Sequence, residues 1–193
     1  MAASSTAAAT AGATGAFRFP EIYSFPPFFT RQPNEATWHE QRRQWCDLIL
    51  AYYKHHRLYR LHLADAITEE PFTNRQIHRA LRADVLRELL EHLVDQGNAA
   101  WTGAKNSRET CLVFWRKPEV WGAMIHQWAS DRGLLSTVLT FFELSNGDDT
   151  EDQEFHGLEP VILRRALDAL QAQGKAQLFV GTSEDDMGVK FFA

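Results

Sequence analysis

The stretches DVLRELLEHLVDQG at residues 84–97 and EPVILRRALDALQAQG at residues 159–174 decide the fold, because the second repeats the pattern of the first. When Gly97 is aligned with Gly174, the apolar residues of the two stretches coincide. These residues are Val85, Leu86, Leu89, Leu90 and Leu93 in the first stretch, and Ile162, Leu163, Ala166, Leu167 and Leu170 in the second. Their spacing is typical of one face of an amphipathic helix, and each glycine suits the left-handed position that follows a helix. The sequence therefore predicts two copies of one unit.

The segments around the repeated helix are also duplicated. In the same alignment Trp101 falls on Leu178 and Phe114 falls on Phe191, which predicts two short strands after each helix. A further amphipathic helix is predicted before each copy from the spacing of large apolar residues. These residues are Trp38, Trp45, Ile49 and Tyr52 in the first copy, and Trp121, Met124, Ile125 and Trp128 in the second.

Between the two helices of each copy lie an apolar run and a signal for the start of a helix. The runs at 58–63 and 135–144 predict one strand in each copy. A capping box, in which two side chains bond each other's backbone at the start of a helix, requires Thr or Ser followed three residues later by Glu or Gln. Two pairs that have this spacing are Thr73 with Gln76 and Thr150 with Gln153. Each pair predicts the start of a helix.

The resulting order is helix, strand, helix, helix, strand, wing loop, strand, which is the order of a winged helix. We predict an α+β fold with two winged-helix domains in tandem, preceded by an extended arm of proline and aromatic residues. The expected segments are a disordered Ala/Ser/Thr tail at 1–16, the arm at 17–36, the first winged helix at 37–116 and the second at 117–193. Pro118 would open the first helix of the second domain, because proline is favoured in a first turn.

Composition and charge exclude several classes of protein. The chain has 193 residues, 45% of them hydrophobic, and a formal net charge of −5, so no overall field gathers nucleic acid or anionic lipid. Cys46 and Cys111 lack C-x-x-C spacing and lie in apolar runs, so we expect both to be buried and reduced, as in a cytosolic protein. No apolar run approaches the length of about 18 residues that crosses a bilayer. The opening residues make a poor secretory signal, because they lack a basic start and a leucine-rich core.

The main alternative is a nucleic-acid-binding winged-helix regulator. In that class the third helix enters the major groove, and its surface needs a clear excess of cations. Here the first repeated helix sets Arg82 and Arg87 against four acids, and the second wing holds consecutive acids at 184–186. The first wing, with Lys105 and Arg108, is only weakly basic. We therefore expect no direct binding of nucleic acid; a steep loss of DNA affinity with salt would identify the alternative.

The sequence contains no motif typical of nucleotide, hydrolase or zinc-protease chemistry. His55, His56 and His62 cluster locally, but adjacent histidines on a helix point in different directions, and no further ligand stands at zinc spacing. The run at 148–159 has acids at calcium-loop positions, yet Gln153 occupies the place that requires glycine. We expect no catalytic residue, no cofactor and no metal, and a metal-dependent enzyme is the weakest alternative.

The arm at 17–36 combines prolines, which restrict the backbone to extended conformations, with rings that offer apolar surface. These residues are Pro20, Pro26, Pro27 and Pro33, and Tyr23, Phe25, Phe28 and Phe29. Such a segment either packs against its own domain or docks into a pocket of another chain, and composition favours neither. A WW domain is a further candidate partner, although PPFF lacks the tyrosine of a PPxY ligand.

Three motifs carry a resemblance to a known family. FPPFFTRQPN at 25–34, WRKPEVWG at 115–122 and ELSNGDDTEDQEFHGLE at 143–159 resemble the family of small subunits of the ESCRT-II complex, and the similarity runs from about Phe19 to Phe192. The resemblance implies two winged helices without catalytic activity. It also implies that two copies join one copy each of two larger winged-helix subunits in a cytosolic complex that is recruited to endosomes. That complex sorts ubiquitinated membrane proteins into multivesicular bodies.

By the same resemblance, the arm and the first winged helix bind the larger subunits. Proline motifs of the family insert into pockets on those subunits, and the second motif matches here at Pro26, Pro27 and Phe29, with Phe in place of the frequent Tyr. The first motif is less regular, because Glu21 replaces a proline. The expected binding residues are Pro20, Tyr23, Phe25, Pro26, Pro27, Phe28 and Phe29.

The resemblance further implies that the second winged helix recruits the ESCRT-III subunit that nucleates the membrane-remodelling polymer, by binding that subunit's basic N-terminal helix. From charge alone we infer which residues attract that helix. The candidates are Asp148, Asp149, Glu151, Asp152 and Glu154. An equally simple interpretation is that these acids only keep the surface soluble. Contact with the membrane would be indirect, through the complex.

Overall fold

The structure, a computed structural model, describes residues 15–103, 108–181 and 187–193. The chain divides into two compact units, Met1–Trp115 and Arg116–Ala193, and this division falls one residue before the expected start of the second domain. Most of the expected tail lies outside the described residues. Lys105 of the first wing and the acids at 184–186 of the second also lie outside them.

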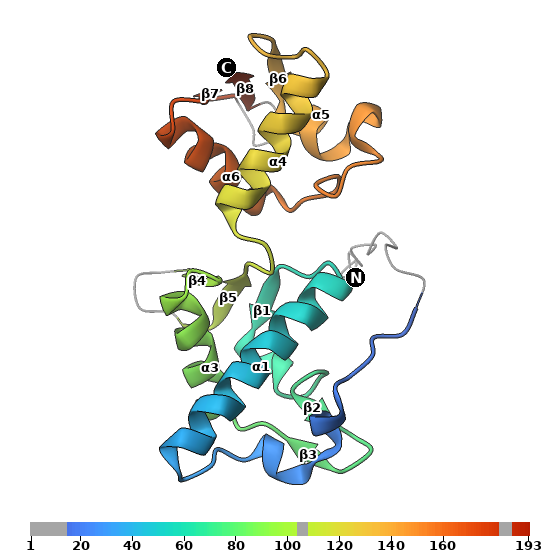
Figure 1. Cartoon of the computed structure of the whole chain (residues 1–193), viewed down its shortest axis with the longest axis vertical. Coiled ribbons are helices and arrows are strands. Elements are labelled where there is room, and N and C mark those ends of the chain that lie inside the picture. Colours follow the sequence, from blue (N-terminus) through green and yellow to red (C-terminus); the bar gives the residue numbers. More distant parts are fainter. Residues whose placement is uncertain (1–14, 104–107, 182–186) are drawn as a thin grey trace, which may run out of the picture. The chain divides into compact units, whose positions relative to one another are not determined.

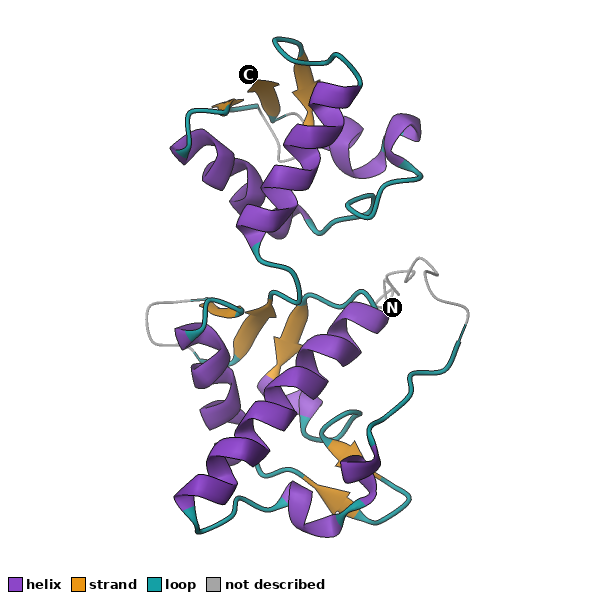
Figure 2. Cartoon of the chain, viewed as in Figure 1, coloured by secondary structure: helices purple, strands orange, loops and turns teal. Residues whose placement is uncertain are grey.

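In the described part of the first unit, two 3-10 helices precede a long helix, α1 (Figures 1 and 2). The elements are η1 (Glu21–Ser24), η2 (Pro26–Phe29), α1 (Glu35–His55), β1 (Arg60–His62), α2 (Leu63–Ala66), β2 (Thr73–Asn74), β3 (Arg79–Ala80), α3 (Ala83–Asp95), β4 (Ala99–Thr102) and β5 (Thr110–Val113). The antiparallel sheet has the order β1-β5-β4, and Cys111 of β5 lies opposite both Leu61 and Trp101. A short hairpin of β2 and β3 lies outside this sheet and was not expected from the sequence.

The described part of the second unit repeats this arrangement without the hairpin. Its described elements are α4 (Pro118–Asp131), β6 (Val138–Thr140), α5 (Phe141–Asn146), η3 (Asp148–Thr150), α6 (Pro160–Ala172), β7 (Ala176–Phe179) and β8 (Gly188–Phe191). The sheet order is β6-β8-β7, with Val189 opposite both Leu139 and Leu178. Pro118 stands in the first turn of α4, as predicted.

The repeated helices α3 and α6 confirm the prediction from the sequence. All ten aligned apolar residues are buried, and both following glycines are left-handed, with φ of 73° at Gly97 and 74° at Gly174. Each helix ends with a matching backbone hydrogen bond from the residue that follows the glycine. After α3, Asn98 N donates to Leu93 O at 2.8 Å, and after α6, Lys175 N donates to Leu170 O at 3.0 Å. This is the Schellman ending, which satisfies carbonyls that a helix leaves free.

Both predicted capping boxes are wrong. Thr73 lies in β2, and its hydroxyl donates to the carbonyl of Ile67 at 2.7 Å. Thr150 ends η3, and its hydroxyl donates to the carbonyl of Gly147 at 2.8 Å. A genuine capping box joins Thr140 and Glu143 at the start of α5. The second helix of each unit begins earlier than expected, at Leu63 in the first unit and at Phe141 in the second. A threonine hydroxyl that donates to a nearby carbonyl gives the backbone an alternative to starting a helix.

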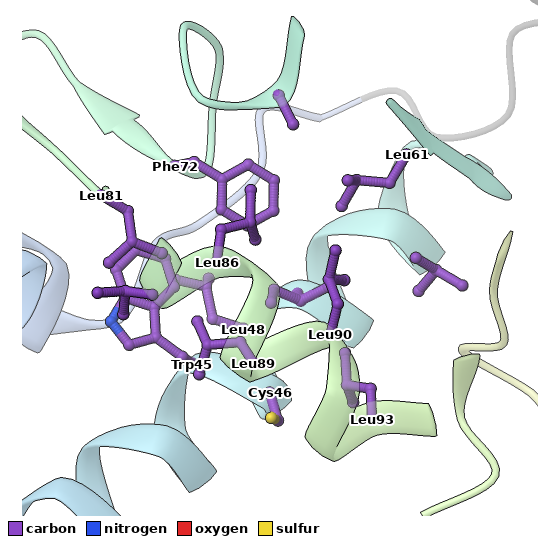
Figure 3. Close-up of a cluster of buried hydrophobic side chains, with 14 of the residues drawn as sticks. Trp45, Cys46, Leu48, Leu61, Phe72, Leu81, Leu86, Leu89, Leu90 and Leu93 are labelled. Atoms are coloured by element: carbon purple, nitrogen blue, oxygen red, sulfur yellow. The ribbon is translucent and has the colours of Figure 1, made fainter. Parts of the chain in front are cut away.

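Aromatic and aliphatic side chains from α1, α3 and the sheet form the core of the first unit. Figure 3 shows Trp45 of α1 beside the leucines of α3, with Leu61 of β1 and Phe72 completing the cluster. Cys46 and Cys111 are buried and free, as predicted. The arm also reaches this core, and its contacts there position the candidate site.

Candidate functional site

The arm lies folded against the rest of the first unit, so the expectation of an extended arm is wrong for its central residues. Residues Glu21–Ser24 and Pro26–Phe29 each form one 3-10 helix, and Pro26 stands in the first turn of the second. The fixed φ of proline suits this tight helix as well as it suits extended backbone. Some side chains of the arm pack on its own domain, and others face outward.

Three of the seven expected binding residues are core residues of this chain. Tyr23, Phe28 and Phe29 are 5%, 3% and 2% exposed. The ring of Phe28 stacks on Trp45 with the centroids 4.4 Å apart, and Phe29 meets the same indole edge to face at 5.3 Å. Their apolar surface is thus already removed from water before any partner arrives.

Gln41 of α1 holds the backbone of the arm and was missed by the sequence analysis. Its Nε2 donates to the carbonyls of Phe28 at 2.7 Å and Thr30 at 3.0 Å, and its Oε1 accepts from Gln32 N at 3.3 Å. The side chain is only 6% exposed. A signal was present in the sequence, because Gln41 is a polar residue on the apolar face of α1 between Trp38 and Trp45. Buried amides at such positions usually hydrogen-bond to backbone.

Tyr23 fixes the beginning of the arm to the β2–β3 hairpin. Its hydroxyl donates to the carbonyl of Thr73 at 3.1 Å, and Asn74 Nδ2 donates to the Tyr23 carbonyl at 2.9 Å. Burial raises the pKa of Tyr23, and the nearby charge of Glu70 raises that pKa further. The phenol therefore stays neutral and remains a hydrogen-bond donor.

The end of the arm is tied to α3. Arg31 Nε lies 3.1 Å from Glu88 Oε2, and the guanidinium stacks over the ring of Trp38 at 5.0 Å. The same carboxylate accepts from the Trp38 indole at 2.8 Å. The arm is thus held at both ends as well as in the middle.

The other four expected binding residues are exposed on the outer side of the arm, and we call them the arm ridge. They are Pro20, Phe25, Pro26 and Pro27. Phe25 is 55% exposed, a large apolar area for a ring on rigid backbone. Between the ridge and α1 lies a groove of about 650 Å³, which we call the notch. It is lined by Ile22, Phe25, Pro27, Phe28, Gln32, Ala36, Thr37, Glu40, Gln41 and Gln44.

The five acids expected to attract a basic helix are exposed in the second unit, but some are partly neutralised. Arg132 lies 3.5 Å from Asp149 and 3.9 Å from Asp152, and both oxygens of Glu154 accept from Arg116 Nη2 at 2.7 and 2.6 Å. The other two acids, Asp148 and Glu151, are also exposed. Of the five, Asp152 lines a groove.

This second groove, of about 610 Å³, follows the outer face of α4. Its lining residues are Val120, Ala123, Met124, Gln127, Trp128, Asp131, Arg132, Asp152 and Gln153. The guanidinium of Arg132 lies over the Trp128 ring at 5.8 Å, which places a cation between the apolar floor and the acids. The groove combines an apolar floor with a rim of mixed charge.

The structure gives no support to a DNA-reading face on α3. Three charged residues of this helix are paired with opposite charges: Asp84 with Arg82, Glu88 with Arg31 and Glu91 with Arg108. Pairing leaves little net positive charge for phosphate. On α6, Arg164 likewise pairs with Asp168 at 3.0 Å.

Potential metal ligands do not gather in the described ranges. There, no group of three or more His, Cys, Asp or Glu side chains is placed to hold a metal ion. His62 forms a hydrogen bond with the Thr110 hydroxyl at 2.9 Å, and the rings of His55 and His56 contact each other. Among the same described residues, no helix has the length and apolarity to cross a bilayer.

In a comparison with known protein families, residues 22–159 of this chain match the family of ESCRT-II complex subunits. A Danio rerio protein named vacuolar protein-sorting-associated protein 25 is 46% identical over 91% of this chain and 99% of its own length. The Homo sapiens protein of that name is 42% identical over 91% of this chain and 98% of its own.

Two solved structures are similar as well. A crystal structure of subunit VPS25 of the endosomal trafficking complex ESCRT-II has a TM-score of 0.79 and 27% identity, covering 89% of this chain and 97% of that one. A crystal structure of the endosomal complex ESCRT-II (VPS22/VPS25/VPS36) contains a chain with a TM-score of 0.77 and 28% identity. That match covers 89% of this chain and 98% of the other.

Proposed function

Because this chain belongs to the family of ESCRT-II complex subunits, we propose that it is the small subunit of an ESCRT-II complex and works as a non-enzymatic adaptor. In this role it helps to sort ubiquitinated membrane proteins into multivesicular bodies. The complex acts in the cytoplasm and is recruited to endosomal membranes, and this chain touches the membrane only indirectly. We infer that its fold is a tandem of winged helices, and the order of helices and strands within each unit supports this.

The larger ESCRT-II subunits bind the arm ridge and the first unit. The carrying observation is the 55% exposure of Phe25 beside Pro26 and Pro27, on a backbone fixed by Gln41 and Trp45. An aromatic ring on rigid backbone is a typical anchor of an interface, because little entropy is lost when it docks. Tyr23, Phe28 and Phe29 then support the ridge from within instead of entering a partner's pocket.

The partners are the counterparts of VPS22 and VPS36, which accompany VPS25 in the related ESCRT-II complex. Two copies of this chain join one copy of each. The second unit recruits the nucleating ESCRT-III subunit, and the supporting observation is that Asp152 stands at the rim of the groove on α4. An apolar floor with acids at its edge suits an amphipathic basic helix.

The test is a titration of the purified chain against the co-expressed pair of larger subunits, with mass and stoichiometry measured by light scattering. We expect two copies of this chain per pair, and a loss of affinity of about tenfold or more in Phe25→Ala. The matched control is Phe179→Ala, another exposed ring, which lies in β7 of the second unit. Absence of any association would overturn the proposal; salt-sensitive binding to a DNA duplex would then favour a winged-helix regulator.

A further inference from the structure

We propose that the notch between the arm and α1 receives an apolar side chain from the same larger subunit that covers the arm ridge. This inference rests on the proposed function, because it assigns the occupant of a groove beside the proposed interface. Contact would then be reciprocal: the ridge enters the partner, and the partner enters the notch. The occupant is a leucine-sized or phenylalanine-sized side chain.

The two walls of the notch come from the arm and from α1. Ile22, Phe25 and Pro27 form the arm side, while Ala36 and Thr37 of α1 form the opposite side. Phe25 and Pro27 belong to both the notch and the ridge, so a surface that covers the ridge also closes the mouth of the notch. If the notch were covered but left empty, the side chains that line it would lose dispersion contacts.

Hydrogen bonds fix the arm wall of the notch before any partner binds. Gln32 Nε2 donates to the carbonyls of Pro27 at 3.1 Å and Thr30 at 2.9 Å, and Gln41 fixes the next turn of the arm from α1. The shape of the arm wall therefore cannot change without breaking these bonds. A site formed in advance costs less entropy to fill.

The charges at the rim favour an apolar occupant over a cation. Among the described residues that line the notch, Glu40 alone is charged, and both of its oxygens are engaged. Arg43 donates to them at 2.6 and 3.0 Å, and Gln44 donates at 2.9 Å. The bonds from Arg43 and then Gln44 lower the pKa of Glu40 to about 2, so the paired carboxylate stays ionised at neutral pH. An incoming lysine or arginine would have to compete with Arg43 for this carboxylate.

The experiment fills the notch without touching the ridge. Ala36 is exposed on the first turn of α1, and Ala36→Leu places a larger side chain in the notch. The matched control is Ala172→Leu, an exposed alanine at the end of α6. Both variants are titrated as full chains against the co-expressed larger subunits, beside wild type and Phe25→Ala, and their thermal unfolding is recorded.

We expect Ala36→Leu to weaken binding by about tenfold, as at a contact near the centre of an interface, with its melting temperature and the control unchanged. Binding of Ala36→Leu that equals or exceeds wild type, while Phe25→Ala binds weakly, would overturn the notch and leave the proposed function standing. Full binding by both Ala36→Leu and Phe25→Ala would overturn the ridge as the interface and the notch with it.

Discussion

The indole of Trp45 meets Phe28 twice: its Nε1 donates to the Phe28 carbonyl at 2.8 Å, and its ring stacks on the Phe28 ring at 4.4 Å. One residue of α1 thus binds both the backbone and the side chain of the arm. The arm is consequently part of the first unit's core, and Trp45 fixes the backbone from which its exposed ridge projects. Substitutions of buried and of exposed arm residues can therefore separate the arm's effect on stability from its effect on binding.

Phe29→Ala should destabilise the chain, because the Phe29 ring is 2% exposed and packs on Trp45. Removing a buried phenylalanine costs about 3–5 kcal/mol of unfolding free energy. Denaturant unfolding of the purified chain measures this loss. The control is Phe25→Ala, which lies outside the core and should change stability by less than about 0.5 kcal/mol. Equal stability of the two variants would mean that the arm does not belong to the core.

Gln41→Met should loosen the arm while keeping the volume of the side chain. It removes one of the two side-chain donors from each of the carbonyls of Phe28 and Thr30, and a typical intramolecular hydrogen bond contributes about 0.5–1.5 kcal/mol. Denaturant unfolding reports the loss in stability, and faster proteolysis within the arm would report its release. Gln44→Met on the same helix serves as the control, since Gln44 bonds to the exposed Glu40. If Gln41→Met were as stable as this control, the hydrogen bonds of Gln41 would not be what holds the arm.

Gly122→Ala should force α4 and α6 apart. A Cβ atom at Gly122 would lie 2.7 Å from the carbonyl oxygen of Ala166 and 3.1 Å from Leu170 Cγ. Overpacking of this kind costs about 1–3 kcal/mol. Thermal unfolding should reveal the effect, with Ser130→Ala on the exposed face of α4 as the comparison. An unchanged melting temperature would show that the two helices can separate freely.

Cys46 and Cys111 should resist thiol reagents in the folded chain. Burial raises the pKa of both thiols from about 9 to about 12, so little reactive thiolate forms at neutral pH. Because the unfolded thiols ionise first, stability should fall as the pH rises from about 9 towards 12. Labelling with Ellman's reagent in buffer and in guanidinium measures the first effect, and Ala172→Cys provides an exposed reference thiol. Rapid labelling of the native wild type would contradict this prediction.

The double change Asp149→Asn and Asp152→Asn should weaken binding of the nucleating ESCRT-III subunit's N-terminal peptide by about fivefold, the worth of two surface charges. It should also reduce the dependence of that affinity on salt. Fluorescence anisotropy at two salt concentrations makes the measurement. The control is Asp95→Asn, an exposed acid at the end of α3 in the first unit. Equal affinity of both variants would leave these acids as solubilising residues.

The sequence predicted the two repeated helices because two independent signals agree there. The apolar spacing places Leu89 and Ala166 in the cores, and a glycine ends each helix with left-handed backbone. The capping boxes failed because spacing alone does not show where a hydroxyl finds its acceptor. Thr73 bonds a carbonyl six residues back, whereas Thr140 completes the box with Glu143.

The arm was only half predictable for a related reason. Composition identified its apolar residues, but Phe25 and Phe28 have the same side chain and opposite surroundings, since only Phe28 faces Trp45. Which ring is buried depends on the turn of a 3-10 helix, and proline restrains φ without choosing that turn. The hydrogen bonds from Gln41 to the arm could have been predicted only by noticing one polar residue on an apolar helix face.

The contacts of Tyr23 set an order of events during synthesis. The residue leaves the ribosome early, yet the amide of Asn74 that binds its carbonyl lies 51 positions later in the chain. Until that hairpin emerges, the aromatic arm has no complete place to dock, and its rings are open to chaperones or to other nascent chains. The arm is therefore the part of the newly made chain that waits longest with exposed apolar surface.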